Sequence, residues 1–373
     1  SIPDCEDENG IKIISMCEID IDGNINLDKI RKVKIEKKKY NLLKKGDLLL
    51  AMTGATIGKN CMYDTDEISY VNQRVGLLRG KGSLTQAFLK YYIDTPLFRE
   101  FISLTCSGSA QENISASQVG GLQFPLPPIQ EQIKIAQYLD IQTATIDQLI
   151  QQKEKLIELL KEKRQAVIYE AVTKGLNPNA KMKDSGIEWM GDIPFYWKVV
   201  SLKRLIDPER PITYGIVQPG EGDPKGRFMI RGQDYSRGWA EPESLFRVSD
   251  EIEIPYARAR VKKGDILITI VGAGVGNLAV VPEWLEGANL TQTTARIAIQ
   301  SDIADAEYMM HLLGSEVGKT NINLWVKGAA QPGLNLSHIK NYKFPLPVLS
   351  EQIRIREWID KKVSQILPIC DLL

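Results

Sequence analysis

The chain is 373 residues long, with 43% hydrophobic and 25% charged residues, and its 47 Lys and Arg residues balance its 47 Asp and Glu residues. This length exceeds what one hydrophobic core usually organises, so we expect two globular units. The composition excludes a disordered chain, and no apolar run approaches the ~20 residues that a membrane-spanning helix requires. Residues 1–10 hold acids and a Pro instead of a basic and apolar signal sequence, so the sequence predicts a cytoplasmic protein.

Cysteine spacing and total charge bear on particular kinds of site. The cysteines form no C-x-x-C pair, so we interpret them as packing residues and expect neither a zinc site nor a disulfide framework. They are Cys5, Cys17, Cys61, Cys106 and Cys370. The neutral total charge is unusual for a nucleic-acid-binding protein, although phosphate attraction depends on where the charges lie.

The first hundred residues predict a domain that opens as β structure and continues with helix. Ile11 to Ile35 alternate between apolar and polar residues in patches, as half-buried strands do. Leu48 to Met52 form a short apolar run after the turn sequence Lys44-Lys45-Gly46-Asp47, which predicts a buried strand. Ala87 to Leu104 carry apolar residues at helical spacing, so the domain is mixed.

From Pro127-Pro128 to about Thr173 the pattern becomes that of one long helix, with Lys174-Gly175 at its end. Such a helix spans roughly 70 Å. Four apolar residues fall on one heptad line, which Lys153 interrupts; they are Leu139, Ile146, Leu160 and Val167. This stripe predicts a helical partner, and the matching segment of the chain starts near Pro347. That second helix stops at Leu373, so we expect it to be truncated relative to the first.

The second half of the chain repeats the first. The sequence KKGDLL at 44–49 returns 218 residues later as KKGDIL at 262–267. Two further blocks return 220 residues later: GSAQ at 108–111 as GAAQ at 328–331, and FPLP through EQI at 124–133 as FPLP through EQI at 344–353. So many identities in the same order indicate two homologous halves.

The halves agree in their later elements and differ in their opening thirds. Ile266 to Val271 predict the equivalent buried strand, and Ala306 to Leu313 predict the equivalent helix. In contrast, Ile13 to Lys39 and Met229 to Arg260 align only loosely. The second copy also has a lead-in from Trp189 to Val200 for which the first has no room, so we expect the chain to start inside its first domain.

This order of domain, Pro-x-x-Glu-Gln helix, second domain and Pro-x-x-x-Glu-Gln helix resembles the specificity subunit of type I restriction-modification systems. The resemblance covers nearly the whole chain. Besides the two helix starts it rests on four segments, Lys44 to Gly58, Lys262 to Gly276, Ala171 to Gly175 and Asp184 to Trp197. It implies an α+β fold in which two homologous mixed α/β target-recognition domains are linked by long antiparallel coiled-coil helices.

The same resemblance implies a binding function without catalysis. Each domain is expected to bind half of a bipartite double-stranded DNA site, and the helices are expected to set the spacing. The implied protein partners are two methyltransferase (modification) subunits and the restriction/translocase subunits, and no cofactor is expected. The expected parts are 1–124, the first target-recognition domain without its N-terminal part; 125–176, the first spacer helix; 177–190, a linker; 191–344, the second target-recognition domain; and 345–373, the truncated second spacer helix.

Two glycine-containing motifs keep an alternative open, an S-adenosylmethionine- or nucleotide-binding enzyme. Gly272 to Gly276 follow a predicted strand, but their G-x-G-x-G spacing departs from G-x-G-x-x-G, and Asn277 to Pro282 predict another strand instead of a helix. Gly314 to Thr320 resemble a Walker A loop with one residue too few between its glycines, and they lie on predicted helix. A coiled-coil scaffold that binds only protein is a further alternative. The sequence predicts no catalytic residue and no metal ligand.

DNA contacts are predicted from two sets of polar positions. If the halves bind different sequences, residues that contact bases should lie where the halves differ, and residues that contact the backbone should lie where they agree. The divergent thirds contribute Lys29, Arg31, Lys32 and Lys34 in the first half and Arg227, Arg231, Gln233, Arg237, Arg258 and Arg260 in the second. The shared positions are Lys44, Lys45, Gln73, Ser107 and Gln111 with Lys262, Lys263, Gln292, Lys327 and Gln331. For each of them, a solvated strand face or a role in the fold is the alternative interpretation.

Overall fold

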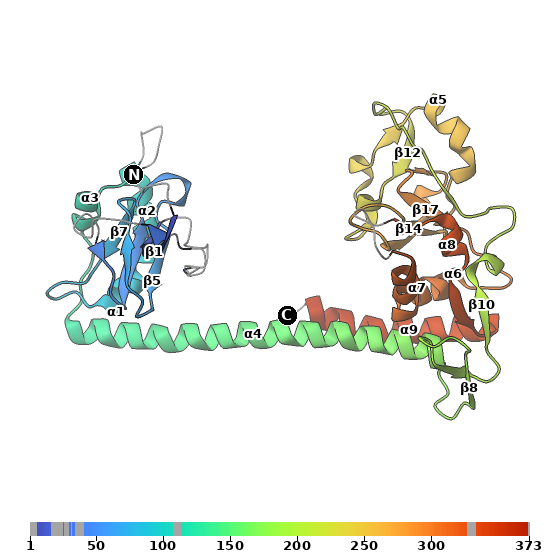
Figure 1. Ribbon diagram of the computed structural model, residues 1–373, viewed down its shortest axis with the longest axis horizontal. Helices are drawn as coiled ribbons and strands as arrows, with labels where there is room; N and C mark the ends of the chain where they lie inside the picture. Colours follow the sequence, from blue (N-terminus) through green and yellow to red (C-terminus); the bar gives the residue numbers. More distant parts are fainter. Residues whose placement is uncertain are drawn as a thin grey trace. The chain divides into compact units, whose positions relative to one another are not determined.

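The computed structural model describes residues 6–15, 25, 30, 32–33, 41–106, 113–326 and 333–371; for 6–9, 55, 326 and 367–371 it describes the backbone alone. Two compact units divide the chain, Ser1–Gln151 and Gln152–Leu373, and each is described by itself (Figure 1). Both combine strands with helices, which confirms the predicted mixed α+β class.

Unit 1 contains two small sheets and short helices. Its elements in chain order are β1 (Glu6–Ile14), β2 (Lys32–Val33), β3 (Asn41–Leu42), β4 (Asp47–Ala51), the 3₁₀ helix η4 (Gly54–Thr56), β5 (Asn60–Tyr63), β6 (Ser69–Val71), β7 (Val75–Leu78), α1 (Gln86–Ile93), α2 (Pro96–Cys106), α3 (Ala116–Gly120) and the first part of α4 (Ile129–Lys174). The strand orders are β2-β1-β6-β3 and β5-β4-β7. Of the predicted strands between Ile11 and Ile35, β1 and β2 are seen; residues 16–24, 26–29, 31 and 34–35 lie outside the described residues.

The predicted strand after the Lys-Lys-Gly-Asp turn is β4, and all five of its residues are buried. Successive side chains of a strand point to opposite faces, so the side chains of β4 contribute to two hydrophobic clusters, one on each face. Leu48 and Leu50 pack in one cluster with Ile102 of α2, while Leu49 packs in the other with Cys61 of β5. This burial on both faces explains why the strand is an unbroken apolar run instead of an alternating one.

The predicted helical stretch from Ala87 to Leu104 is two helices, α1 and α2. Thr95 and Pro96 separate them, since the Thr95 hydroxyl accepts a hydrogen bond from the backbone N of Phe98 (3.3 Å) and Pro suits a first helical turn. Cys106 of α2 and Cys61 are buried among apolar side chains, as predicted for packing residues.

Unit 2 repeats this plan with additions. Its elements after the last part of α4 are β8 (Met182–Asp184), β9 (Asp192–Pro194), β10 (Lys198–Ser201), η5 (Leu202–Arg204), β11 (Thr213–Tyr214), β12 (Arg227–Ile230), η6 (Gly232–Tyr235), η7 (Pro242–Ser244), β13 (Arg247–Val248), α5 (Asp250–Glu253), η8 (Ile254–Ala259), β14 (Ile266–Thr269), β15 (Leu278–Val280), η9 (Glu283–Leu285), β16 (Asn289–Leu290), β17 (Thr294–Ile297), α6 (Ala306–Gly314), α7 (Glu316–Val326), α8 (Leu336–Lys340), β18 (Lys343–Leu346) and α9 (Leu349–Asp371). The strand orders are β11-β17-β14-β15, β13-β12-β16, β10-β18 and β8-β9.

Strand β14 is the predicted equivalent of β4 and is likewise buried along its whole length. Ile266 and Ile268 face the core cluster that includes helix α6, and Leu267 faces the cluster beneath β12. The second Phe-Pro-Leu-Pro sequence differs from the first because β18 pairs antiparallel with β10 of the lead-in. The lead-in is therefore part of the sheet structure of the second half.

The long helix α4 runs from Ile129 to Lys174, as predicted, and its 46 residues span roughly 69 Å. Its predicted partner is α9, which runs along the last turns of α4 in the opposite direction (Figure 1). Ile168 and Val172 of α4 share one core cluster with Ile355 and Ile359 of α9. None of the helices in the described part of the chain combines the length and the apolar composition that crossing a membrane requires.

Candidate nucleic-acid interface

In the second half, several loops meet at the residue that follows β14. The backbone N of Ile270 donates to Thr293 O (2.8 Å), and Leu334 N donates to Ile270 O (2.8 Å). The hydroxyl of Thr269, the last residue of β14, lies 2.8 Å from the Tyr235 hydroxyl. Residues 231–239, 271–276, 291–293 and 333–334 are thereby held together, and we call this group the loop end of the second half.

The first half builds the same arrangement after β4. The backbone N of Met52 donates to Arg74 O (3.1 Å), and Ile114 N donates to Met52 O (2.9 Å). An isolated bridge joins Thr53 to Asn113, and its counterpart in the second half joins Val271 to Gly333. Residues 52–58, 72–74 and 113–114 form the loop end of the first half, so the repeat in sequence is also a repeat of this site.

Several predicted DNA contacts lie at these loop ends. Gln233, Arg237 and Gln292 are exposed at the loop end of the second half, and Gln73 is exposed at that of the first. The predicted contacts Ser107, Gln111, Lys327 and Gln331 lie outside the described residues, as do Lys29, Arg31 and Lys34. Lys32 is exposed on β2. At the loop end of the second half, the structure therefore brings Gln233 and Arg237, which are predicted to contact bases, together with the shared position Gln292.

The shared lysines lie at the other end of the central strand. Lys44 and Lys45 precede β4, and Lys262 and Lys263 precede β14, whereas the loop ends follow those strands. In the first half, the five residues of β4 separate the lysines from the loop end by roughly 16 Å. The four lysines are exposed, with Lys45 near Asp64 (3.4 Å) and Lys263 paired with Glu283 (2.7 Å). The four lysines and the loop-end residues Gln73 and Gln292 therefore lie at opposite ends of the central strands.

The Asp of the Lys-Lys-Gly-Asp sequence stabilises the turn that the sequence forms. Asp47 accepts a hydrogen bond from the backbone N of Lys44 (2.7 Å) and pairs with Arg79 (2.6 Å). Burial raises the pKa of the Asp47 carboxyl, but the Arg79 and Lys44 hydrogen bonds outweigh it and hold that pKa below its usual value. Asp265 repeats the turn with Lys262 N (2.6 Å) and Arg210 (2.5 Å). The identity of this block in the two halves follows from the turn that it builds.

Two predicted contacts of the divergent third hold a buried carboxylate instead of facing solvent freely. Glu253 has a fully buried side chain, and Arg260 donates two hydrogen bonds to it (2.6 and 2.7 Å). Arg227 lies 3.4 Å from the same carboxylate, and Asn289 donates to it at 2.8 Å. A buried charge requires such partners, so the geometry assigns Arg227 and Arg260 first to the fold.

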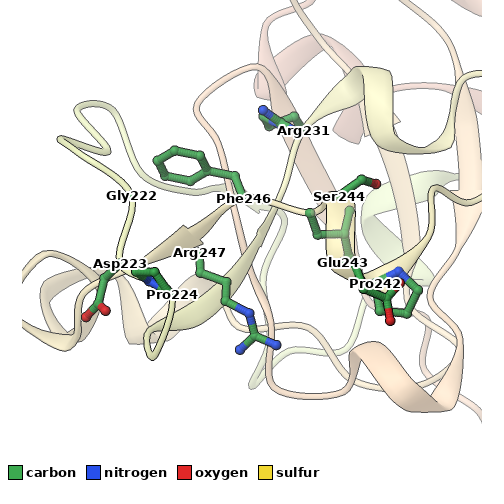
Figure 2. A pocket seen from close by; sticks show the side chains of 10 residues that line it. Gly222, Asp223, Pro224, Arg231, Pro242, Glu243, Ser244, Phe246 and Arg247 are labelled. Carbon is green, nitrogen blue, oxygen red and sulfur yellow. The ribbon is translucent and has the colours of Figure 1, made fainter.

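An open pocket of about 550 Å³ lies beside β12 and β13 in the second half (Figure 2). Arg231, which also pairs with Asp234 (2.9 Å), and Arg247 line it with Phe246. The Arg247 guanidinium lies 3.7 Å from the ring centroid of Phe228 and donates to Gly226 O (3.0 Å). Asp223 and Glu243 also line the pocket, and both guanidinium groups already have partners within the chain, so this lining does not single out an anionic ligand.

Arg247 and Phe246 line this pocket but are not among the residues predicted from the sequence to contact DNA. The Phe246-Arg247 pair within the divergent third is the signal that could have found them. The remaining predicted arginine of this third, Arg258, is exposed on η8, where its carbonyl accepts from Arg296 (2.9 Å). Because η8 is not one of the segments that form the loop end, Arg258 lies outside it.

The glycine-rich sequence from Gly272 to Gly276 is a turn between two antiparallel strands. Gly272 and Gly276 have positive φ angles of 100° and 90°, which favour Gly. The chain then continues into β15, as predicted, and the turn opens no helix. The helix N-terminus on which a dinucleotide or S-adenosylmethionine loop depends is therefore not built by this motif.

The Walker-like sequence lies on the predicted helices, with Gly314 at the end of α6 and Gly318 within α7. A Cβ at Gly318 would lie 1.8 Å from Leu313 O, so close packing of the backbone explains this glycine. We expect Gly318→Ala to destabilise the second half by about 1–3 kcal/mol in urea denaturation. Gly314→Ala is the matched control, since no heavy atom lies within 4 Å of its added Cβ. Equal stability of the two variants would contradict this explanation.

Comparisons with known proteins agree with this repeated arrangement. The family described as "Type I restriction modification DNA specificity domain" matches residues 4–159 and 230–367. The chain is 31% identical over 330 residues to the type I restriction enzyme EcoBI specificity subunit of Escherichia coli, covering 87% of this chain and 67% of that protein. It is 25% identical over 346 residues to the MjaVIII specificity subunit of Methanocaldococcus jannaschii, covering 90% of this chain and 76% of that protein.

Two solved structures share the fold. A chain from a structure of a type I R-M system, described in terms of complex assembly and conformational transition, has a TM-score of 0.74 at 16% identity, covering 97% of this chain and 86% of that one. The HsdS subunit from Thermoanaerobacter tengcongensis has a TM-score of 0.58 at 17% identity, covering 96% and 84%. With the family match over both halves and a relative at 31% identity, the chain belongs to the family of type I restriction-modification DNA specificity subunits.

Proposed function

We propose that this chain is the sequence-specific DNA-binding subunit of a type I restriction-modification complex, and that each half binds one part of a bipartite double-stranded site. The observation that carries the proposal is the loop end, built twice by the same backbone hydrogen bonds in a chain of this family. Each copy presents exposed polar side chains, Gln73 in one and Gln292 in the other. Two similar sites with different surrounding residues suit two different half-sites.

The side chains at the loop end of the second half suit contact with base edges. Arg can pair with guanine through two hydrogen bonds, and Gln can do so with adenine. Arg237 and Gln233 offer this chemistry from the divergent third. Gln73 and Gln292 occupy equivalent positions in the two halves, so we assign them to the sugar-phosphate backbone, whose chemistry does not depend on sequence.

We assign the helices to spacing and to the docking of protein partners. The roughly 69 Å of α4 exceed one ~34 Å turn of duplex DNA, so a helix of this length can separate two DNA-binding domains. Ile146, Leu149 and Ile150 on α4 are at least half exposed, which supports docking of the two methyltransferase subunits there. The restriction/translocase subunits would join the same complex. The subunit itself would be non-catalytic, since the relatives that it matches are specificity subunits.

Arg237 and Arg258 form a matched pair for mutation. Both are exposed, and among the described residues neither guanidinium donates a hydrogen bond or forms an ion pair. We expect Arg237→Ala to weaken DNA binding by the assembled complex roughly tenfold or more, because a lost base contact costs about 1–3 kcal/mol. Arg258→Ala should cost less than threefold. Fluorescence anisotropy with labelled duplex measures both, and equal losses would contradict the assignment of the loop end.

Selection from a random duplex pool tests the proposed function. The chain assembled with its methyltransferase subunits should enrich two short blocks at a fixed separation, and its affinity should fall steeply with added salt. Enrichment of one short block alone would refute the bipartite site. A complex that shows no salt-dependent DNA affinity would favour a coiled-coil scaffold that binds only protein. Calorimetric binding of S-adenosylmethionine or ATP by the isolated chain would favour the enzyme alternative.

A further inference from the structure

One fully buried polar side chain occurs at the same place in both halves. Gln132 in the first turns of α4 and Gln352 in the first turns of α9 both have zero exposure. Burying an amide is costly unless its hydrogen bonds are made, so a buried Gln is informative where an apolar residue would fill the same space.

In unit 1 the Gln132 amide joins α4 to the start of α1. Its Oε1 accepts from the backbone N (2.8 Å) and the hydroxyl (3.1 Å) of Thr85, which caps α1. Its Nε2 donates to Ser83 O (2.7 Å) and to Pro127 O (2.8 Å). Both ends of the amide are thus used, three of these bonds reaching residues 83–85 of the domain.

In unit 2 the Gln352 amide makes the same connection between α9 and the start of α6. Its Oε1 accepts from the backbone N of Asp305 (2.9 Å), the residue that caps α6. Its Nε2 donates to Ile303 O (3.2 Å) and to Pro347 O (2.9 Å). Residues 303, 305 and 347 are the counterparts of 83, 85 and 127, each 220 positions later.

A second contact follows about two helical turns later in each half. The Tyr91 hydroxyl donates to Asp140 in unit 1, and His311 Nε2 lies 2.8 Å from Asp360 Oδ1 in unit 2. Eight residues of helix separate the two contacts by about 12 Å. Two fixed points on one helix restrict both its tilt and its rotation relative to the domain. The buried contact uses a Gln of the long helix in both halves, and the exposed contact uses an Asp of that helix in both, with Tyr91 as its partner in one half and His311 in the other.

We infer that Gln132 and Gln352 are positioning residues that fix the angle between each DNA-binding domain and its spacer helix, and that they thereby set the number of base pairs between the two parts of the DNA site. The inference rests on the proposed function. One added base pair moves the second part by about 3.4 Å and rotates it by about a tenth of a turn, so a loose joint would accept neighbouring spacings. A polar group that is satisfied in a single orientation is a known means of specifying one arrangement among several.

The test compares spacer preference in the wild type and in the double variant Gln132→Met/Gln352→Met. Met keeps the length of the side chain but makes none of the amide hydrogen bonds. Gln130→Met is the matched control, because Gln130 is exposed on the same turn of α4. Anisotropy would be measured on labelled duplexes carrying the selected two-part sequence with its own spacer, and with that spacer lengthened or shortened by one base pair.

The wild type and Gln130→Met should lose at least tenfold in affinity on either altered spacer, whereas the double variant should lose less than threefold. Hydrogen exchange at the backbone N of Thr85 and Asp305 should become faster in the double variant while the rest of each unit keeps its protection, which shows that the protein is folded. If unfolding prevents this comparison, Gln132→Asn/Gln352→Asn replaces the variant, since it shortens the side chain and keeps the amide; it should also accept the altered spacers.

A uniform loss on all three duplexes, with spacer preference unchanged, would overturn the inference and leave the proposed function standing. A wild-type complex that binds the three duplexes equally would instead overturn the proposed bipartite function, and the inference with it.

Discussion

Replacing Glu253 by Gln is expected to destabilise the second half by about 1.5–3 kcal/mol, because it removes the charge that strengthens the hydrogen bonds of this side chain. Arg260 donates twice to this fully buried carboxylate, and Asn289 also donates to it. Urea denaturation followed by circular dichroism measures the loss. Glu251→Gln is the control, because Glu251 is exposed on the same short helix α5. A Glu253→Gln variant as stable as Glu251→Gln would contradict the structural role of this network.

The same network predicts a pH dependence of stability. The Arg260 hydrogen bonds lower the pKa of Glu253 and outweigh its burial, and Asn289 and the nearby Arg227 lower it further. A group whose pKa is lower in the folded state stabilises the fold above its unfolded pKa of about 4.3, and this contribution disappears as the pH falls through the folded pKa. The free energy of unfolding of the wild type should therefore fall below about pH 4, more steeply than that of Glu253→Gln. Parallel pH profiles would contradict the lowered pKa.

Replacing Trp197 by Ala is expected to destabilise the second half by about 3–5 kcal/mol, the usual cost of removing a large buried aromatic side chain. Trp197 is completely buried, its indole N donates to Glu351 (3.3 Å), and its ring lies 3.2 Å from where a Cβ at Gly175 would be. It therefore joins the end of α4 to the start of α9. Thermal denaturation measures the loss.

Phe195→Ala is the control for Trp197→Ala, since the Phe195 side chain is 55% exposed and its removal should cost well under 1 kcal/mol. The Trp197→Ala variant should also lose protection from hydrogen exchange in the last turn of α4. If both variants melt at the same temperature, Trp197 is not the residue that holds the two helices together.

The elements that depend on local spacing could be predicted from the sequence. Strands β4 and β14 and the two long helices follow from apolar runs and heptad spacing, and the glycine turn after β14 follows from the strand that comes next. The break between α1 and α2 was missed because apolar spacing continues across Thr95 and Pro96. A capping residue followed by Pro marked the boundary.

The candidate site was only partly predictable, because its partners are distant in the sequence. Arg227 and Arg260 look like free cations in the sequence, but the acid that engages them is buried, and burial of a charged residue cannot be read from its neighbours. Likewise, the position of Lys44 and Gln73 at opposite ends of β4 depends on which strands pair. Divergence between the halves selected Gln233 and Arg237 together with Arg227 and Arg260, so divergence alone does not separate exposed residues from residues that serve the fold.

The most direct test of the central claim, that each half binds its own part of the DNA site, is an anisotropy titration of wild type and Gln233→Ala/Arg237→Ala on four duplexes. These carry the selected sequence intact, with the first part scrambled, with the second part scrambled, or with both scrambled. Scrambling one particular part should abolish the difference between the two proteins, whereas scrambling the other should leave that difference unchanged. A variant that loses the same factor on all four duplexes, or that responds equally to both parts, would contradict this claim.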